Sequence, residues 1–238
     1  MAKPPPPRNR HRTAAVAGAA IIAVLVIAIV VVVIRSARHT PDPPAAAPSG
    51  AVVAPAIATA DGALAVGDSA APVRVEVFLD YMCPYCGRFD RANSSELHRL
   101  VENRTIRLEL YPLAFLDEMS RGTRYSTRAA NAAATVADRA PDRFLTFSAA
   151  LFAEQPAEQT PGLSDEQIAA LARNAGVPDG VGTAFGDHTF VPWIVQTTQR
   201  ALNTEITGTP TVRINGARFE GDLFSAGPLT EAVLAAKG

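Results

Sequence analysis

The chain has 238 residues, of which 48% are hydrophobic and 19% are charged, and its formal net charge is −1. A nearly neutral chain has no electrostatic basis for binding nucleic acid, so we expect no nucleic-acid partner. Only 2 residues are cysteines, which excludes a fold held together by several disulfides.

A short basic segment at the N-terminus is followed by a long apolar run. Residues 1–12 contain a lysine, three arginines and a run of prolines, and the apolar run covers residues 13–34. About 20 apolar residues suffice to span a bilayer, so we expect a single transmembrane helix at 13–34. A cleaved signal peptide is the alternative, but its apolar region is about 7–15 residues long and ends in small residues. This run ends instead in three valines, Ile34 and Arg35, although cleavage near the alanines at 45–47 stays open.

The flanks of the apolar run predict its orientation. More basic residues precede it than follow it, where Arg35 and Arg38 lie. Because basic flanks favour the cytoplasmic side, we expect a cytoplasmic N-terminus and an extracytoplasmic C-terminal domain, in an oxidising compartment. Residues 35–60 are rich in proline and alanine and are interpreted as a semi-extended tether. Ordered docking of this segment onto the domain is the alternative.

The two cysteines form one motif, CPYC at 83–86, between an apolar, β-branched run at 73–79 and a helix candidate at 87–101. We expect Cys83 to cap this helix, with Pro84 at its first position, where a missing N–H costs nothing. The free N–H groups and the dipole of the helix then lower the pKa of Cys83, which predicts that it is the attacking thiolate.

The second cysteine, Cys86, lies one turn deeper in the predicted helix, as suits a resolving thiol. A structural disulfide or half of a zinc site is the alternative interpretation. A zinc site needs about four ligands, and the chain has no second cysteine pair. His98 is the only nearby histidine, and its spacing along the helix makes it a poor partner. The motif therefore favours redox chemistry.

A Thr209-Pro210 pair precedes a strand candidate at 211–214, and an Asn-Gly turn at 215–216 leads into a second run at 217–220. Asn-Gly between two such runs is a strong hairpin signal. Coupled to an upstream CPYC motif, the Thr-Pro pair is typical of the cis-proline loop of a thioredoxin fold. An ordinary trans turn proline is the alternative.

The chain between the two motifs is longer than a simple crossover requires. After a strand candidate at 106–111, roughly ninety residues intervene, where about 10–12 would suffice. Their composition predicts helices, and Ser164 with Gln167 matches a capping box. Helix candidates are 124–139, 141–154, 164–174 and 193–202, with a further one at 229–237 near the C-terminus.

The helix candidate at 141–154 carries an apolar stripe. The stripe could line a peptide groove, but its spacing favours packing in the core. Its members are Phe144, Phe147, Leu151 and Phe152.

Taken together, residues 78–86 (FLDYMCPYC) and 208–211 (GTPT) resemble the DsbA family of thiol–disulfide oxidoreductases, here in a membrane-anchored form. The resemblance covers the chain from about residue 63 to its C-terminus. It implies an α/β, thioredoxin-like fold at 61–238 with an inserted α-helical domain at about 116–204.

The resemblance also implies site residues and partners. Cys83 and Cys86 would be catalytic, while Thr209 and Pro210 would hold an extended substrate chain beside them. The redox-active disulfide would serve without a cofactor or metal. Expected partners are cysteine-containing extracytoplasmic proteins and a membrane redox partner of the DsbB or VKOR type, which would reoxidise the dithiol.

Three features depart from the prototypical DsbA. Pro84-Tyr85 replaces the Pro-His pair that lies between the cysteines of DsbA, and glutaredoxins have the same Pro-Tyr pair. Reduction potentials run from about −120 mV for DsbA to about −200 mV or below for glutaredoxins. The Pro-Tyr pair therefore predicts a milder oxidant than DsbA. Many relatives have a buried acid six residues before the first cysteine, and Val77 occupies that position here. Glu76 is one residue away and faces the other side of the strand, so it does not replace that acid. Asp80 is closer to the motif and is interpreted as a solvated loop carboxylate.

The third departure, a threonine before the cis-proline, resembles the disulfide isomerases. Two further function classes therefore stay open beside the oxidase. One is an extracytoplasmic reductase or isomerase, and the other is a peptide-binding or chaperone module with an inert disulfide.

Overall fold

The computed structural model describes residues 52–204 and 206–238. The predicted basic segment at 1–12, the predicted transmembrane helix at 13–34 and most of the tether therefore lie outside the described residues. Within the described part of the chain, no helix is both long and apolar enough to cross a membrane.

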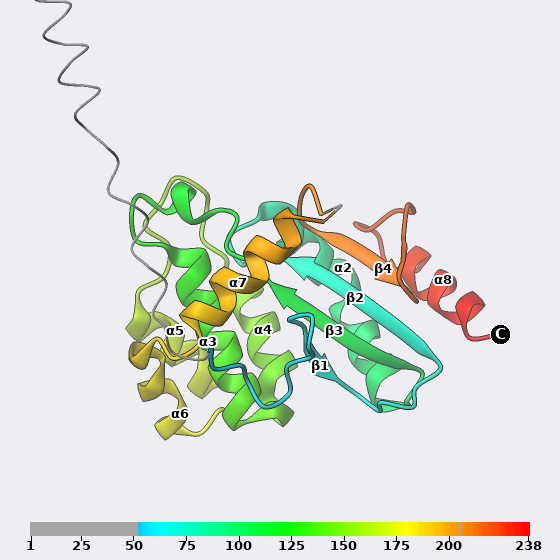
Figure 1. Cartoon of the computed structure of the whole chain (residues 1–238), viewed down its shortest axis with the longest axis horizontal. Coiled ribbons are helices and arrows are strands. Elements are labelled where there is room, and N and C mark those ends of the chain that lie inside the picture. The colour runs from blue at the N-terminus through cyan, green and yellow to red at the C-terminus, as the bar shows by residue number, and fades with distance from the viewer. Residues whose placement is uncertain (1–51, 205) are drawn as a thin grey trace, which may run out of the picture. The chain divides into compact units, whose positions relative to one another are not determined.

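A five-stranded mixed sheet, with strand order β1-β3-β2-β4-β5, forms the centre of the domain (Figure 1). β2 runs parallel to β3, and the other neighbouring pairs are antiparallel. The strands are β1 (Leu64–Val66), β2 (Val73–Leu79), β3 (Ile106–Pro112), β4 (Thr211–Ile214) and β5 (Ala217–Arg218).

The central strand β2 coincides with the run predicted at 73–79. Its residues Val73, Val75 and Val77 are fully buried, as expected for a strand covered on the face they occupy. The predicted Asn-Gly hairpin is also confirmed, because Asn215 and Gly216 both adopt positive φ, 51° and 85°, between β4 and β5. Positive φ at both positions characterises the type I′ turn.

Most of the predicted helices are present. The capping box is confirmed, because the Ser164 hydroxyl oxygen accepts a hydrogen bond from the Gln167 N–H, and the Ser164 N–H donates one to Gln167 Oε1. The α-helices are α2 (Pro84–Glu102), α3 (Tyr125–Arg139), α4 (Phe144–Ala153), α5 (Asp165–Asn174), α6 (Asp179–Thr183), α7 (Val191–Leu202) and α8 (Pro228–Ala236), and the 3-10 helices are Asp117–Ser120, Pro141–Arg143 and Ala184–Asp187.

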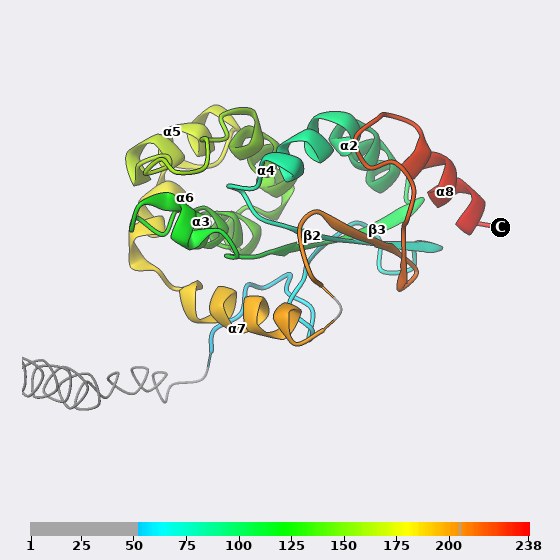
Figure 2. The ribbon, with the colours of Figure 1, turned by 90° about the horizontal axis from the view of Figure 1, so that it is seen from above.

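The helices form layers on the two faces of the sheet. Seen along the sheet, α2 and α8 lie on one face and α7 lies on the other, while α3, α5 and α6 gather beyond one end (Figure 2). The predicted insertion at 116–204 thus separates into a helical group, α3 to α6, and α7, which covers the sheet itself.

The apolar stripe of α4 packs in the core and does not line a groove. Its four residues, which are Phe144, Phe147, Leu151 and Phe152, are at most 2% exposed. The rings of Phe147 and Phe185 stack with centroids 5.9 Å apart, which joins α4 to the 3-10 helix before α7.

The predicted tether at 35–60 extends too far, because its last residues, 55–60, pack against the folded domain. Pro55 is buried, the Ala56 N–H donates to Asp138 Oδ1 at 2.8 Å, and Ala58 forms a β-bridge with Leu64. The alternative of ordered docking therefore holds for residues 55–60. Composition alone missed this, because the partners lie in a strand and a helix further along the chain.

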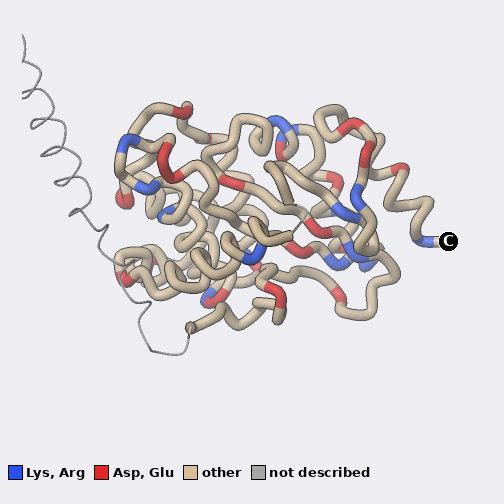
Figure 3. Tube along the Cα trace, turned by 45° about the horizontal axis from the view of Figure 1, so that its top comes forward, with Lys and Arg blue, Asp and Glu red and all other residues tan. Residues whose placement is uncertain are grey.

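Charged residues of both signs are interspersed along the described chain (Figure 3). Many of them pair locally, such as Arg99 with Glu96 on α2 and Arg128 with Asp165 between helices. Exposed pairs of this kind contribute about 0–1 kcal/mol each, so the buried apolar residues carry most of the stability.

Candidate redox site

The CPYC motif lies where β2 ends and α2 begins. The loop at 80–82 leaves the sheet, and the Cys83 N–H donates to the Asp80 carbonyl at 3.0 Å. Cys83 is the N-cap of α2, and Pro84 occupies the first turn, as the sequence predicted. Both cysteines are free thiols. Cys83 is 5% exposed and Cys86 is 0% exposed, so Cys83 is the more accessible sulfur.

The two thiols have opposite electrostatic environments. Hydrogen bonds lower the pKa of Cys83 to about 6, the strongest from the Cys86 thiol and others from Thr209 and the N–H groups of Tyr85 and Cys86. Burial raises the pKa of Cys86, and the hydrogen bond it gives to Cys83 adds to the rise. At neutral pH, Cys83 is therefore the thiolate and Cys86 the thiol.

The Thr209-Pro210 loop lies directly against the CPYC motif, although the two are far apart in the sequence. The Thr209–Pro210 peptide bond is cis, and the Cys83 Sγ lies 3.3 Å from the Thr209 carbonyl oxygen. The loop is held there because Thr211 in β4 pairs with Phe78 in β2, the strand that leads to Cys83. All six predicted site residues thus belong to one continuous site.

Tyr85 forms the exposed rim of this site. Its side chain is exposed, and its ring lies 5.9 Å from that of Phe224, which follows β5. The Arg88 guanidinium lies over the Phe224 ring at 4.6 Å and over the Tyr85 ring at 5.9 Å. The surface beside Cys83 is therefore aromatic with one positive charge.

Asp80 is not the solvated carboxylate that the sequence suggested, because it is fully buried. Its Oδ1 accepts hydrogen bonds from the Met82 N–H at 2.8 Å and the Ser126 hydroxyl at 2.7 Å, and its Oδ2 accepts one from the Leu116 N–H at 2.9 Å. Burial raises the pKa of Asp80 to about 6. Its own N–H donates to Cys86 Sγ at 3.5 Å, so Asp80 ties the motif to α3.

Gln155 is a site residue that sequence reasoning missed. It follows α4, and its Nε2 donates to the carbonyls of Tyr81 at 3.0 Å and Cys83 at 2.9 Å. A Cβ atom at Gly87 would lie 2.2 Å from Gln155 Oε1, so the glycine leaves room for this side chain. No local pattern marks Gln155, because its partners precede it by more than seventy residues.

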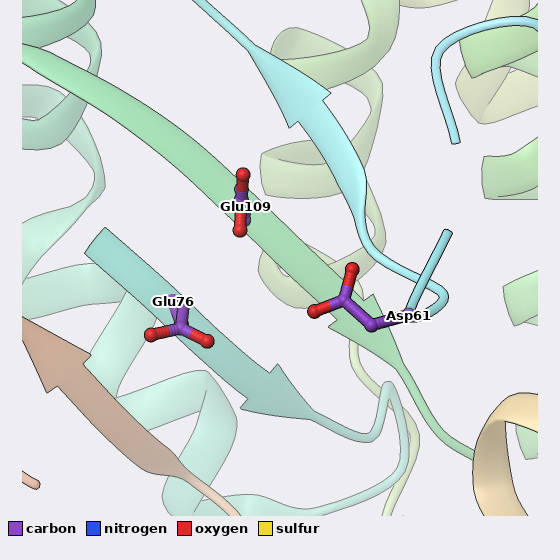
Figure 4. Close-up of side chains that lie close together, drawn as sticks. All are labelled: Asp61, Glu76 and Glu109. Carbon is purple, nitrogen blue, oxygen red and sulfur yellow. The ribbon is translucent and has the colours of Figure 1, made fainter. Parts of the chain in front are cut away.

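The arrangement supports exchange between thiols and a disulfide. It places an acidic thiol next to a more deeply buried, less acidic one, and the backbone carbonyl of Thr209 beside the first. Within the described residues, one group of side chains has the spacing of a metal site, namely Asp61, Glu76 and Glu109 (Figure 4), and neither cysteine belongs to it.

Comparison with known proteins agrees with this geometry. A family model described as thioredoxin matches residues 59–227. Reduced DsbA from Mycobacterium tuberculosis is 27% identical, with 74% of this chain and 100% of that chain covered at a TM-score of 0.60. MdbA, a thiol-disulfide oxidoreductase from Actinomyces oris, is 25% identical, with 76% of this chain and 88% of that chain covered at a TM-score of 0.67.

A curated relative of different overall design shares part of the chain. The serine/threonine-protein kinase PknE of Mycobacterium tuberculosis is 35% identical over 115 residues, which are 47% of this chain and 20% of the kinase. The chain therefore spans about a fifth of that relative's length. With the family model covering most of the chain and DsbA and MdbA sharing its architecture, the chain belongs to the thioredoxin family and is a protein thiol–disulfide oxidoreductase.

Proposed function

We propose that this oxidoreductase is anchored in the membrane through residues 13–34 and donates its Cys83–Cys86 disulfide to secreted or membrane proteins. The observation that carries the direction is the contrast between the two thiols. Stabilising the Cys83 thiolate stabilises the reduced enzyme, and a stabilised reduced form makes the disulfide easier to give away. The basic segment at 1–12 supports a cytoplasmic N-terminus and an extracytoplasmic domain.

In the proposed reaction, a substrate thiolate attacks Cys83 Sγ of the oxidised enzyme. The bond between Cys83 and Cys86 breaks, a mixed disulfide forms on Cys83, and Cys86 leaves as a thiolate that takes up a proton, as its raised pKa favours. The Thr209 backbone beside Cys83 holds the substrate chain in an extended form.

A second substrate thiolate then attacks the substrate sulfur of the mixed disulfide. Cys83 leaves as a thiolate, which its low pKa favours, and the substrate departs with a new disulfide. Two electrons have passed to the enzyme. A quinone-linked membrane protein of the DsbB or VKOR type would remove them and restore the disulfide.

The direction of electron flow is tested by the reduction potential of the full chain in detergent, equilibrated with glutathione buffers. We expect a value of about −120 to −180 mV, toward the oxidising end of the family. A value near that of thioredoxin, about −270 mV, would make the dithiol the working form and the protein a reductase.

The roles of the two cysteines are tested by trapping. Cys86→Ser should accumulate mixed disulfides with cellular proteins on Cys83, since the resolving thiol is gone, and Cys83→Ser is the matched control. Gels run without reductant display the adducts. If Cys83→Ser collects adducts and Cys86→Ser does not, the assignment of roles is reversed.

A further inference from the structure

Two exposed aromatic side chains meet beside the CPYC motif, from segments that are far apart in the sequence. Tyr85, in the first turn of α2, is 55% exposed, and Phe224, between β5 and α8, is 37% exposed. Their ring centroids lie 5.9 Å apart, with an angle of 47° between the ring planes. Single exposed apolar side chains are common on protein surfaces, but this pair is placed to contact any molecule that reacts with Cys83.

The segment that carries Phe224 is fixed on α2. Asn93, a buried residue of α2, donates from its side-chain amide to the Leu223 carbonyl at 2.9 Å and to the Phe89 carbonyl at 3.0 Å. The Phe224 N–H donates to Asp222 Oδ1 at 2.7 Å. These hydrogen bonds hold the backbone that leads to Phe224, so the position of its ring beside the motif is built into the fold.

Arg88 lies over this aromatic pair and lacks an ion-pair partner. The residue is exposed, and its guanidinium is 4.6 Å from the ring centroid of Phe224 and 5.9 Å from that of Tyr85. A guanidinium stacked on an aromatic ring keeps its in-plane N–H groups free to bind a carboxylate through two parallel hydrogen bonds. Among the described residues, no carboxylate lies within ion-pairing distance of Arg88.

Asp222 interacts with the charge of Arg88, but its carboxylate is hydrogen-bonded within its own loop. Hydrogen bonds from the Ser225 side chain and from the Phe224 N–H lower the pKa of Asp222, and the charge of Arg88 has a smaller effect in the same direction. Asp222 thus offsets part of the positive potential at Arg88 without occupying its N–H groups. Those N–H groups are therefore available to an acidic group of another molecule.

The distance from Cys83 to Arg88 is one that an extended substrate chain can span. From the N-cap at Cys83 to Arg88, the helix rises by about 7.5 Å, and alternate side chains on one face of an extended chain are about 7 Å apart. In a mixed disulfide with Cys83, a substrate backbone lies beside Thr209, whose carbonyl is next to the Cys83 sulfur. Such a chain can bring the residue two positions from its cysteine to Arg88.

We propose that Tyr85, Arg88 and Phe224 form a recognition surface for substrate proteins that carry an acidic residue two positions from the reactive cysteine. The substrate carboxylate binds the Arg88 guanidinium, and the hydrocarbon part of the same side chain packs on the two rings. This inference rests on the substrate placement beside Thr209 that is part of the proposed function. It does not depend on the direction of electron flow, because oxidation and reduction of a substrate pass through the same mixed disulfide on Cys83.

The test measures how fast the reduced full chain, in detergent, reacts with peptides whose single cysteine is capped by 2-nitro-5-thiobenzoate. The Cys83 thiolate attacks the peptide sulfur, a mixed disulfide forms, and the coloured thiobenzoate leaves as a thiolate. Cys86 then displaces the peptide thiolate, and the enzyme ends oxidised. The peptides carry glutamate or glutamine two positions before or after the cysteine. In one of these placements, we expect the glutamate peptide to react about two to five times faster than its glutamine match, as for an exposed ion pair, and the preference to vanish in about 1 M salt.

Two variants and a control decide between outcomes. Arg88→Gln should abolish the preference for glutamate, and Phe224→Ala should lower it, because the ring under the guanidinium is gone. Arg104→Gln removes an exposed arginine beyond the far end of α2 and should keep the preference. Because the preference is a ratio of two rates, any change in the pKa of Cys83 cancels.

The proposal is overturned if neither placement of glutamate is favoured, or if the preference survives in Arg88→Gln. A wild type that reacts with glutamate and glutamine peptides at equal rates refutes this inference alone and leaves the exchange chemistry intact. A wild type that reacts with none of the peptides refutes the exchange chemistry as well.

Discussion

The pKa of Cys83 should depend on the thiol of Cys86, because the hydrogen bond from Cys86 is the largest influence lowering it to about 6. Cys86→Ala removes that donor, whereas Cys86→Ser replaces it with a hydroxyl donor of similar position. A hydrogen bond to a charged group is worth about 1.5–3 kcal/mol, which corresponds to about one to two pKa units. We therefore expect a pKa of about 7–8 for Cys83 in Cys86→Ala and about 6 in Cys86→Ser.

The difference in thiolate fraction between the two variants is large at pH 6, where it can be read from the alkylation rate. With a pKa of about 6, half of Cys83 is thiolate at pH 6, and with a pKa of about 7–8 the thiolate fraction falls to roughly 1–9%. Cys86→Ala should therefore react with iodoacetamide about five to fifty times more slowly than Cys86→Ser. The ultraviolet absorbance of the thiolate, followed against pH, gives the pKa itself.

The reasoning is refuted if the two variants titrate alike. Equal pKa values near 6 would mean that the backbone N–H groups and Thr209 suffice to stabilise the thiolate. Equal values near the ordinary thiol pKa of about 8.5 would mean that the site does not activate Cys83 at all. The second result would also remove the support for the oxidase direction.

Further predictions concern the residues that hold the motif. Because the folded pKa of Asp80, about 6, lies above its unfolded value, Asp80 contributes stability at low pH that is lost as pH rises through 6. In urea unfolding of the oxidised protein, the fall in stability between pH 4 and pH 7 should be smaller by up to about 3 kcal/mol in Asp80→Asn, and an unchanged slope would contradict the burial argument. Gln155→Ala leaves two loop carbonyls without their donor and should cost about 1–3 kcal/mol in unfolding free energy, against little change in the exposed control Gln199→Ala. Gly87→Ala should displace Gln155 and lower the unfolding free energy when it is made in the wild type. Made in the Gln155→Ala variant, the same change should raise the unfolding free energy by up to about 1 kcal/mol, because alanine is the better helix former. A decrease in both backgrounds would show that the glycine serves another purpose.

Local patterns predicted the elements that carry the chemistry. The valines of 73–79, the proline at the first turn of α2 and the Asn-Gly turn each specify their own backbone within a few residues, and the structure has all of them. The elements that were missed have weak local signals. β1 has three residues, and α6 contains Gly180 and Gly182, which are poor helix formers.

The surroundings of the cysteines could not be read from the sequence. Asp80 looks like a loop carboxylate until Ser126 and Leu116 are brought to it, 46 and 36 residues further along. The role of Gln155 could not be predicted either, since it donates to backbone carbonyls, which every residue has and which therefore leave no sequence pattern. The contacts between the CPYC motif and the helical group could therefore not be predicted from the sequence, because they depend on packing between residues far apart in the chain.

The separation of 126 positions in the sequence between Cys83 and Thr209 also imposes an order on the molecule's synthesis. At about 5–20 residues per second, Cys83 is made roughly 6–25 s before the loop that covers it. During that interval, the nascent chain carries the CPYC motif without its neighbouring strand β4. A growing chain therefore has no substrate-binding surface beside the Cys83 sulfur, and selective exchange begins only once the Thr209-Pro210 loop and β4 have been added.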